Sequence, residues 1–232
     1  MNPAPFTRFG PSHLTALAVL AGVFFLLRHL TRRRPESRAA RPLERLFGTL
    51  LLLIWPTNVL IRWYDGSLTW GTALPLHYCD IPAISGGLAL WTRHTAAFHL
   101  TYYWGMAGTL QGLITPSITQ DFPSPVYFHF FTWHGLVIIA GLHGILNLRL
   151  TPPRGTWKRM LGGTLLYGFS VLAIDFLLPA NYGFLREKPL TGSLMDSLGP
   201  WPWYLASLAL VAALLYGVLE KIARRFSDSA GR

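Results

Sequence analysis

The strongest constraint on the fold of this chain is a series of seven apolar segments, each near the length that crosses a lipid bilayer as a helix. The segments lie at residues 14–30, 43–62, 74–91, 96–115, 127–148, 160–179 and 203–222. The hydrocarbon core requires about 17–25 helical residues. A spanning segment must also satisfy its backbone hydrogen bonds internally, because the bilayer core holds no water. The sequence therefore predicts an all-α integral membrane protein with about seven transmembrane helices in one bundle.

Composition agrees with this class. The 232 residues are 51% hydrophobic and 13% charged, whereas soluble domains carry about 25% charged residues. The length suits a single membrane domain over residues 1–232. One cysteine, Cys79, excludes an intrachain disulfide and a cysteine-rich zinc site.

The positions of lysine and arginine predict the orientation. The net charge of +10 arises from cations placed between apolar segments, which argues against a nucleic-acid partner. If the N-terminus lies outside and the C-terminus in the cytoplasm, 16 of the 20 cations are cytoplasmic. Many of them fall in a basic loop at residues 31–42, which we expect to contact anionic lipid. The positive-inside rule favours this orientation over its inverse.

Polar residues gather at one depth of the predicted bundle. Ionisable groups inside a membrane are unfavourable and usually mark function. With the predicted orientation, such residues from several segments fall in the outer half, under the polar loop 181–203. They are His77, Cys79, Asp80, Gln111, Thr115, His129, His134 and Asp175. The sequence therefore predicts one functional site on the outer side.

Helical spacing divides these residues into faces. On the fourth segment a 3-4-3-4 spacing predicts one common face, formed by Thr101, Trp104, Gly108, Gln111 and Thr115. This face could line the site, or it could pack closely against another helix through its small residues.

On the fifth segment His129 and His134 fall on opposite faces, so they are not expected to serve one site. On the third, His77 and Asp80 are three residues apart and can meet, while Cys79 points about 100° away. Cys79 therefore needs a partner from another helix.

Cys79 and His134 form a candidate pair of nucleophile and base. A thiol is mostly protonated at neutral pH and needs a proton acceptor or a positive environment to react. In the predicted helix Cys79 lies in the second turn after Pro75, where the helix dipole helps only weakly. The alternative is a small buried thiol with no chemical role.

Other chemistries fit less well. His99 and His143 could face one another and bind haem or a metal, although histidines buried for packing are the simpler interpretation. No lysine lies mid-span, which argues against a retinal Schiff base. The paired broken helices of a transporter are not evident.

Several motifs between residues 74 and 204 resemble a known family. They read PLHYCD at 75–80, TYYWG at 101–105, GTLQGLITP at 108–116, FTWHG at 131–135, NYGFL at 181–185, KP at 188–189 and GPWPWY at 199–204. Together they resemble the YwaF-like family of bacterial integral membrane proteins. They are also similar to animal multi-pass acyltransferases that move polyunsaturated acyl chains between phospholipids with a membrane cysteine. That resemblance implies that Cys79 is the catalytic cysteine and that His134, in the Trp-His-Gly motif, is the catalytic histidine.

The predicted function is therefore acyl transfer or ester cleavage on a membrane phospholipid, in the plasma (inner) membrane of a bacterium. Cys79 would attack the acyl carbonyl, and His134 would carry the proton. We expect the residues that support or bind the substrate to be His77, Asp80, Tyr102, Trp104, Gln111 and Asn181. We expect no metal, cofactor or nucleic acid. The alternative class is a non-enzymatic lipid-binding or scaffolding membrane protein.

Overall fold

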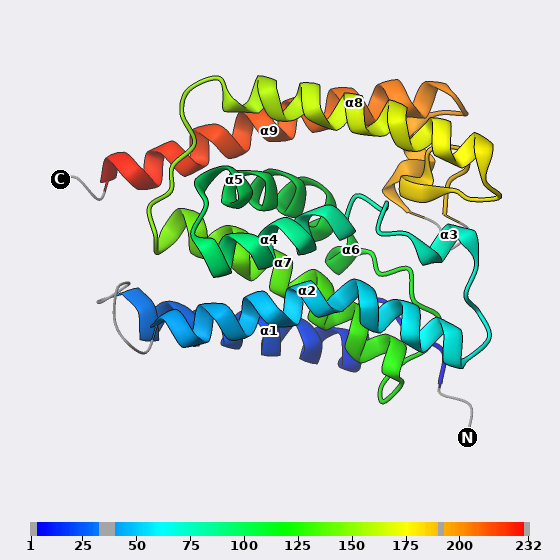
Figure 1. The fold of residues 1–232 in the computed structure, drawn as a ribbon, viewed down its shortest axis with the longest axis horizontal. Coiled ribbons are helices and arrows are strands. Elements are labelled where there is room, and N and C mark those ends of the chain that lie inside the picture. Colours follow the sequence, from blue (N-terminus) through cyan, green and yellow to red (C-terminus); the bar gives the residue numbers. More distant parts are fainter. Residues whose placement is uncertain (1–3, 33–39, 190–192, 230–232) are drawn as a thin grey trace. The chain divides into compact units, whose positions relative to one another are not determined.

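The computed structural model describes residues 4–32, 40–189 and 193–229, in which the regular secondary structure is helical and no β-strand occurs (Figure 1). The long α-helices are α1 (Pro11–Arg32), α2 (Ala40–Tyr64), α7 (Pro125–Leu146), α8 (Thr156–Leu177) and α9 (Trp203–Ser229). The shorter ones are α3 (Trp70–Ala73), α4 (Asp80–Thr92), α5 (Thr95–Trp104) and α6 (Leu110–Ile114). A π-helical turn, η1 (Gly105–Thr109), joins α5 to α6, and two 3₁₀ turns follow α8, η2 (Tyr182–Phe184) and η3 (Leu194–Leu198).

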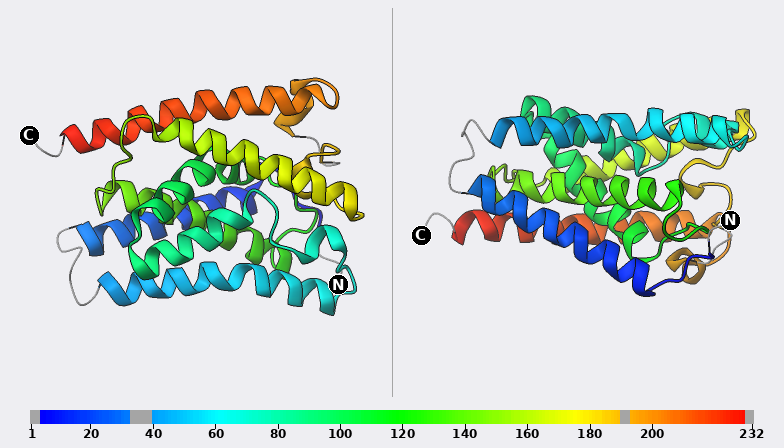
Figure 2. Two further views of the ribbon diagram at one scale, coloured as in Figure 1. Left: turned by 45° about the horizontal axis from the view of Figure 1, so that its top comes forward. Right: turned by 90° about the horizontal axis from the view of Figure 1, so that it is seen from below.

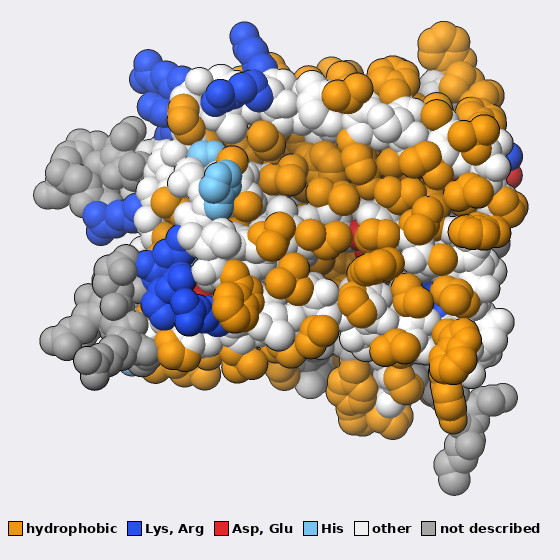
Figure 3. All heavy atoms as spheres, in the orientation of Figure 1, with side chains coloured by type: hydrophobic (Ala, Val, Ile, Leu, Met, Phe, Trp, Pro, Cys, Tyr) orange, Lys and Arg blue, Asp and Glu red, His pale blue; other side chains and the backbone are white. Residues whose placement is uncertain are grey.

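Five of these helices, α1, α2, α7, α8 and α9, are long and apolar enough to cross a membrane. The prediction of an all-α membrane protein is thereby confirmed. Large apolar side chains also cover much of the molecular surface seen in Figure 3, as expected where lipid is the solvent. Within the predicted basic loop, residues 33–39 lie outside the described residues.

The helix predicted over residues 74–91 begins later than expected, at Asp80. Its 13 residues extend about 20 Å, less than the ~30 Å hydrocarbon core. Residues 74–79 are not helical, because tyrosine side chains supply some of the hydrogen bonds that a helix would have made. The hydroxyl of Tyr167 donates to the carbonyl of Leu76 at 2.9 Å, and the hydroxyl of Tyr182 accepts from the amide of Leu74 at 3.0 Å.

The helix predicted over residues 96–115 is not continuous. At η1 the amide of Leu110 donates to the carbonyl of Gly105, five residues back. A π turn holds one residue more than an α turn, so everything after it is rotated from the face predicted by 3.6-residue spacing. The single common face predicted from Thr101 to Thr115 is therefore wrong. Thr101 is fully buried, whereas Gln111 is partly exposed.

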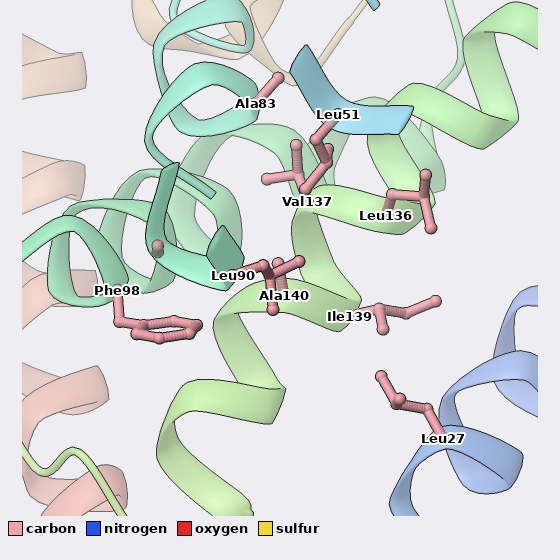
Figure 4. Close-up of a cluster of buried hydrophobic side chains, with 10 residues drawn as sticks. Leu27, Leu51, Ala83, Leu90, Phe98, Leu136, Val137, Ile139 and Ala140 are labelled. Atoms are coloured by element: carbon pink, nitrogen blue, oxygen red, sulfur yellow. The ribbon is translucent and has the colours of Figure 1, made fainter. Parts of the chain in front are cut away.

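The chain forms two compact units, each described here by itself. The first unit comprises residues 1–54 and 82–150. Its core is centred on α7, where Val137 and Ala140 are buried with side chains of α1, α2, α4 and α5 (Figure 4). Helix α5 approaches α7 closely because α7 carries glycine at the contacts. A Cβ at Gly144 would lie 2.6 Å from the ring of Phe98.

A buried carboxylate organises one end of the first unit. Glu44, in the first turns of α2, is fully buried. It accepts hydrogen bonds from Arg41 at 2.9 Å and from Arg93, in the turn between α4 and α5, at 2.8 and 3.0 Å. It also accepts one at 3.0 Å from Nε2 of His143, on α7. Basic side chains gather at this end of α2 in Figure 3.

The same network reaches the end of α1. The side-chain amide of Asn147, which follows α7, donates to Nδ1 of His143 at 2.9 Å and to the hydroxyl of Thr31 at 2.9 Å. Its carbonyl oxygen accepts from Arg28 at 3.1 Å. The network thus joins the end of α1, the start of α2, the α4–α5 turn and the end of α7.

The opposite helix ends meet at the other end of the unit. His13, near the start of α1, contacts the carbonyl of Leu113 in α6 at 2.8 Å through Nε2. Ser12 donates to Asp121 at 2.9 Å, and its carbonyl accepts from Tyr127 at the start of α7 at 2.6 Å. The helices of this unit therefore alternate in direction.

The second unit comprises residues 55–81 and 151–232. Helices α8 and α9 lie side by side in it (Figure 2). Glu220 of α9 caps the N-terminus of α8, because its carboxylate accepts hydrogen bonds from the backbone amides of Gly155 at 2.9 Å and Trp157 at 3.0 Å. Further along, the hydroxyls of Thr164 and Tyr216 lie 3.0 Å apart.

Candidate functional site

Cys79 immediately precedes α4 and is half-buried. The positive end of a helix dipole stabilises a nearby negative charge, and the effect is confined to the first turn. The sequence predicted a weak dipole effect because it placed Cys79 in the second turn. With the helix starting at Asp80, the cysteine instead lies at the helix N-terminus, one of the environments that favour a thiolate.

His77 is fixed in one neutral form by two backbone groups. Its Nδ1 accepts a hydrogen bond from the amide of Gly183 at 3.2 Å, so the ring proton is on Nε2, which contacts the carbonyl of Gly71 at 3.3 Å. Asp80 accepts from the backbone amide of His77 at 2.9 Å. His77 and Asp80 therefore meet as predicted, although through the backbone of His77, and both hold the segment that carries Cys79.

Tyrosines anchor the same segment from α8 and η2. The hydroxyl of Tyr78 donates to the carbonyl of Thr164 at 3.3 Å. Tyr182, besides its bond to Leu74, donates to the carbonyl of Trp70. Burial raises the pKa of Tyr182, so its phenol stays protonated and remains a donor. Gly183 lies against Tyr78 with φ of 63°, where a Cβ would lie 2.7 Å from the ring.

An open pocket of about 420 Å³ lies beside this segment in the second unit. Its lining includes Thr69, His77, Asn181, Phe184, Arg186 and Glu187. The amide of Asn181 holds this loop together, because its oxygen accepts from the backbone amides of Arg186 at 3.0 Å and Glu187 at 3.2 Å. Its nitrogen donates to the carbonyl of Glu187 at 2.8 Å. Asn181 therefore lines the pocket while shaping the loop.

His134 lies in the first unit in the tautomer that a general base needs. Its Nδ1 contacts the carbonyl of Phe130 at 2.9 Å and must donate to it, which leaves the lone pair of Nε2 as the basic one. The ring stacks on Phe130 with centroids 4.0 Å apart. Gly112 gives the ring its space, since a Cβ there would lie 2.9 Å from Nε2. Gln111, the preceding residue, is partly exposed.

Three other histidines of the first unit each have a hydrogen-bond partner of their own. His129 contacts the carbonyl of Ile54 at 3.0 Å, whereas His134 contacts that of Phe130. His99 contacts the carbonyl of Leu150 at 3.0 Å, while His143 bonds Glu44. The described residues contain no cluster of three His, Cys, Asp or Glu side chains arranged to hold a metal ion.

Tyr102 and Trp104, predicted to support the site, are both buried in α5. The sequence-based reasoning did not identify the parts played by Tyr167, Tyr182 and Gly112. The first two hydroxyls act on a segment distant in the chain, so no local spacing could reveal them. Gly112 could have been noticed from the sequence only by its position inside the motif at residues 108–116.

These features define a polytopic membrane protein that carries a cysteine at a helix N-terminus and a buried histidine with its basic nitrogen at Nε2. The chain belongs to the TMEM164 family, whose model matches residues 8–220. It is also similar to an uncharacterized protein of Treponema pallidum (strain Nichols), with 28% identity over 217 residues. The match covers 91% of this chain and 89% of that protein. No solved structure matches the chain.

Proposed function

We propose that the protein is a lipid acyltransferase or esterase in which Cys79 is the nucleophile and His134 the base. The observation that carries the proposal is the position of Cys79 at the start of α4, on a segment fixed by side chains from α8 and η2. A nucleophile held in one geometry on a rigid support is what covalent catalysis requires. The Nε2 lone pair of His134 supplies the matching proton acceptor.

The reaction would begin with transfer of the Cys79 thiol proton to Nε2 of His134. The thiolate then attacks the acyl carbonyl carbon of a phospholipid ester, the ester C–O bond breaks, and the departing alcohol takes the proton back from the imidazole. A second hydroxyl resolves the thioester by the same route in reverse. A lysophospholipid as acceptor gives acyl transfer, and water gives hydrolysis. Gln111 and Asn181, both partly exposed, are the candidates for holding the lipid head group.

The topology belongs to the same proposal. We infer seven crossings, with the N-terminus outside and the C-terminus in the cytoplasm of a bacterium, and α4 and α5–α6 as the third and fourth crossings. The Glu44 network supports this, because it joins the end of α1, the start of α2, the α4–α5 turn and the end of α7, all of which the inferred topology places in the cytoplasm. The excess of arginine at these helix ends agrees with the positive-inside rule.

One observation favours the alternative of a lipid-binding or scaffolding protein. The side chains of His77 and Asn181 are bonded to the protein's own backbone, as residues that only hold a loop would be. Enzymes also use such bonds to fix a catalytic group. Activity measurements must therefore separate the two functions.

The test is phospholipid turnover by purified protein carrying changes at the two proposed groups. Cys79→Ala and His134→Ala should each abolish turnover, and the double variant should be no worse than either, because residues that act as one unit are not additive. Cys79→Ser should also be inactive while folding normally, since serine is similar in size but far less nucleophilic. Wild-type turnover by Cys79→Ala protein would refute the proposal.

A further inference from the structure

The open pocket of about 420 Å³ lies wholly within the second unit, and Arg186 is the one lysine or arginine among its described lining residues. Other polar side chains that line it are already bonded within the protein. His77 contacts backbone groups through both ring nitrogens, and Asn181 bonds the backbone of its own loop through its oxygen and its nitrogen. The guanidinium of Arg186 is therefore the charged donor that the pocket offers to a ligand.

Arg186 is held in place through one of its nitrogens. Its Nη1 donates to the carbonyl of Asp175 at 2.8 Å and to that of Ala180 at 3.4 Å. Its guanidinium carbon lies 5.3 Å from the centroid of the Phe176 ring. A guanidinium carries five N–H donors in a fixed planar fork. Among the described residues, Nε and Nη2 have no hydrogen-bond partner, so part of this fork stays free.

The positive charge of Arg186 has no bonded counter-charge. The two acceptors of Nη1 are backbone carbonyls, which carry no net charge. No carboxylate of the described residues lies within 4.0 Å of the guanidinium. Asp175 is fully buried and accepts instead from the amide of Tyr182 at 2.9 Å. Glu187 lines the pocket but is exposed, so water weakens its field.

The free fork indicates the chemistry of the ligand. A planar pair of N–H donors with an unpaired positive charge matches two oxygens of a phosphate group. In the inferred topology the pocket lies on the outer side of a membrane protein, where lipid phosphates are the abundant anions. His77 lines the pocket and precedes Cys79 by two residues. The same loop and segment therefore carry both the pocket and the proposed nucleophile.

We propose that Arg186 binds a phosphate group in this pocket, and that in the membrane this group is the phosphodiester of a phospholipid. The inference rests on the proposed function for the identity of the ligand, because it names the residue that holds the head group of the substrate. It does not depend on the acyl transfer itself. Binding can therefore be measured on protein that lacks the cysteine.

The test is calorimetric titration of purified Cys79→Ala protein with three probes. They are dihexanoylphosphatidylglycerol, dihexanoylglycerol, which lacks the phosphate, and inorganic phosphate. Adding Arg186→Gln should weaken phosphatidylglycerol binding about tenfold or more, because charged hydrogen bonds to the phosphate are lost. Dihexanoylglycerol binding should not change. Arg186→Lys, which keeps the charge but not the fork, should give an intermediate affinity.

Arg62→Gln is the matched control. Arg62 belongs to the same unit, but its Nε donates to the side chain of Asn58 at 3.2 Å and it does not line the pocket. This change removes the same charge and should leave the affinities for all three probes unchanged.

Two results would overturn the assignment of Arg186. One is wild-type affinity for phosphatidylglycerol in the Arg186→Gln protein. The other is an equal fall in affinity for phosphatidylglycerol and dihexanoylglycerol, which a disrupted loop would cause.

The inorganic phosphate titration identifies the source of the phosphate. We expect it to bind more weakly than phosphatidylglycerol. Equally tight binding that Arg186→Gln also removes would support the phosphate site and overturn the lipid as its ligand. Equal phospholipid turnover by wild-type and Cys79→Ala protein would refute the proposed reaction, while the titrations would still decide the role of Arg186.

Discussion

Replacing Glu44 by glutamine should destabilise the first unit strongly. The carboxylate is fully buried and accepts hydrogen bonds from Arg41, Arg93 and His143. Glutamine keeps the shape of the side chain but removes its charge. It also turns one acceptor oxygen into an amide nitrogen that faces the donors. Two arginines then lose their counter-charge at the end of α2.

The expected loss follows from the exposure of the partners. Removing one member of a buried ion pair costs about 3–5 kcal/mol, because the remaining charge is left uncompensated. The side chains of Arg41 and Arg93 are 28% and 18% exposed, so water relieves part of this penalty. We therefore expect a loss of about 2–3 kcal/mol for Glu44→Gln. For a chain of this size that corresponds to a melting temperature lower by roughly 5–10 °C.

Thermal unfolding of purified protein in detergent measures the effect, and a double-mutant cycle with Arg93→Gln identifies its cause. Removing both partners leaves less uncompensated charge than the single changes imply. The loss in the double variant should therefore be smaller than the sum of the two single losses by about 1 kcal/mol or more. A shift below about 1 °C for Glu44→Gln, or strictly additive losses, would refute the reasoning.

Three further predictions follow from the same structure. Gly112→Ala should reduce turnover at least tenfold, since its methyl group would displace the imidazole of His134. Gly108→Ala should be active, because the added carbon meets no atom of another element within 4 Å. The stability of the protein should fall as the pH rises above about 10, because the folded protein holds the Tyr182 proton more tightly than the unfolded chain does. The Tyr182→Phe protein should lose less stability in this range, and an equal loss in both proteins would contradict the prediction. In a Cys79→Ala background, a cysteine near Asp121 should react from outside and one near Arg224 only from the cytoplasm, and the reverse pattern would contradict the inferred topology.

The membrane class was predictable because long apolar segments leave few alternatives. The start of α4 was not, since residues 74–79 are apolar enough to read as helix. Their conformation depends on Tyr167 and Tyr182, more than 80 positions away in the chain. Helical spacing likewise assumed 3.6 residues per turn through residues 105–109, where the backbone forms a π turn. Both differences arise from tertiary contacts or backbone geometry that a local pattern does not contain.

The assignment of residues to the candidate site remains a prediction. Residue type selected Cys79 and His134, and helical spacing placed His129 and His134 on different faces of one helix; in the structure these two histidines contact different backbone carbonyls. Sequence reasoning did not identify Glu44 as a buried residue. Glu44 is the second residue of the apolar segment 43–62, where a charged side chain is expected at the exposed end of a helix. Only the structure shows this carboxylate fully buried among its hydrogen-bond donors.

Detection of an acyl-enzyme tests the central claim most directly. Purified wild-type protein incubated with phospholipid and examined by intact-protein and peptide mass spectrometry should carry one fatty-acyl group on Cys79. Hydroxylamine at neutral pH should remove this group, as it does a thioester. The His134→Ala protein should form the adduct far more slowly, and the Cys79→Ala protein should not form it. Equal phospholipid turnover by wild-type and Cys79→Ala protein, with no acyl group on either, would contradict the account.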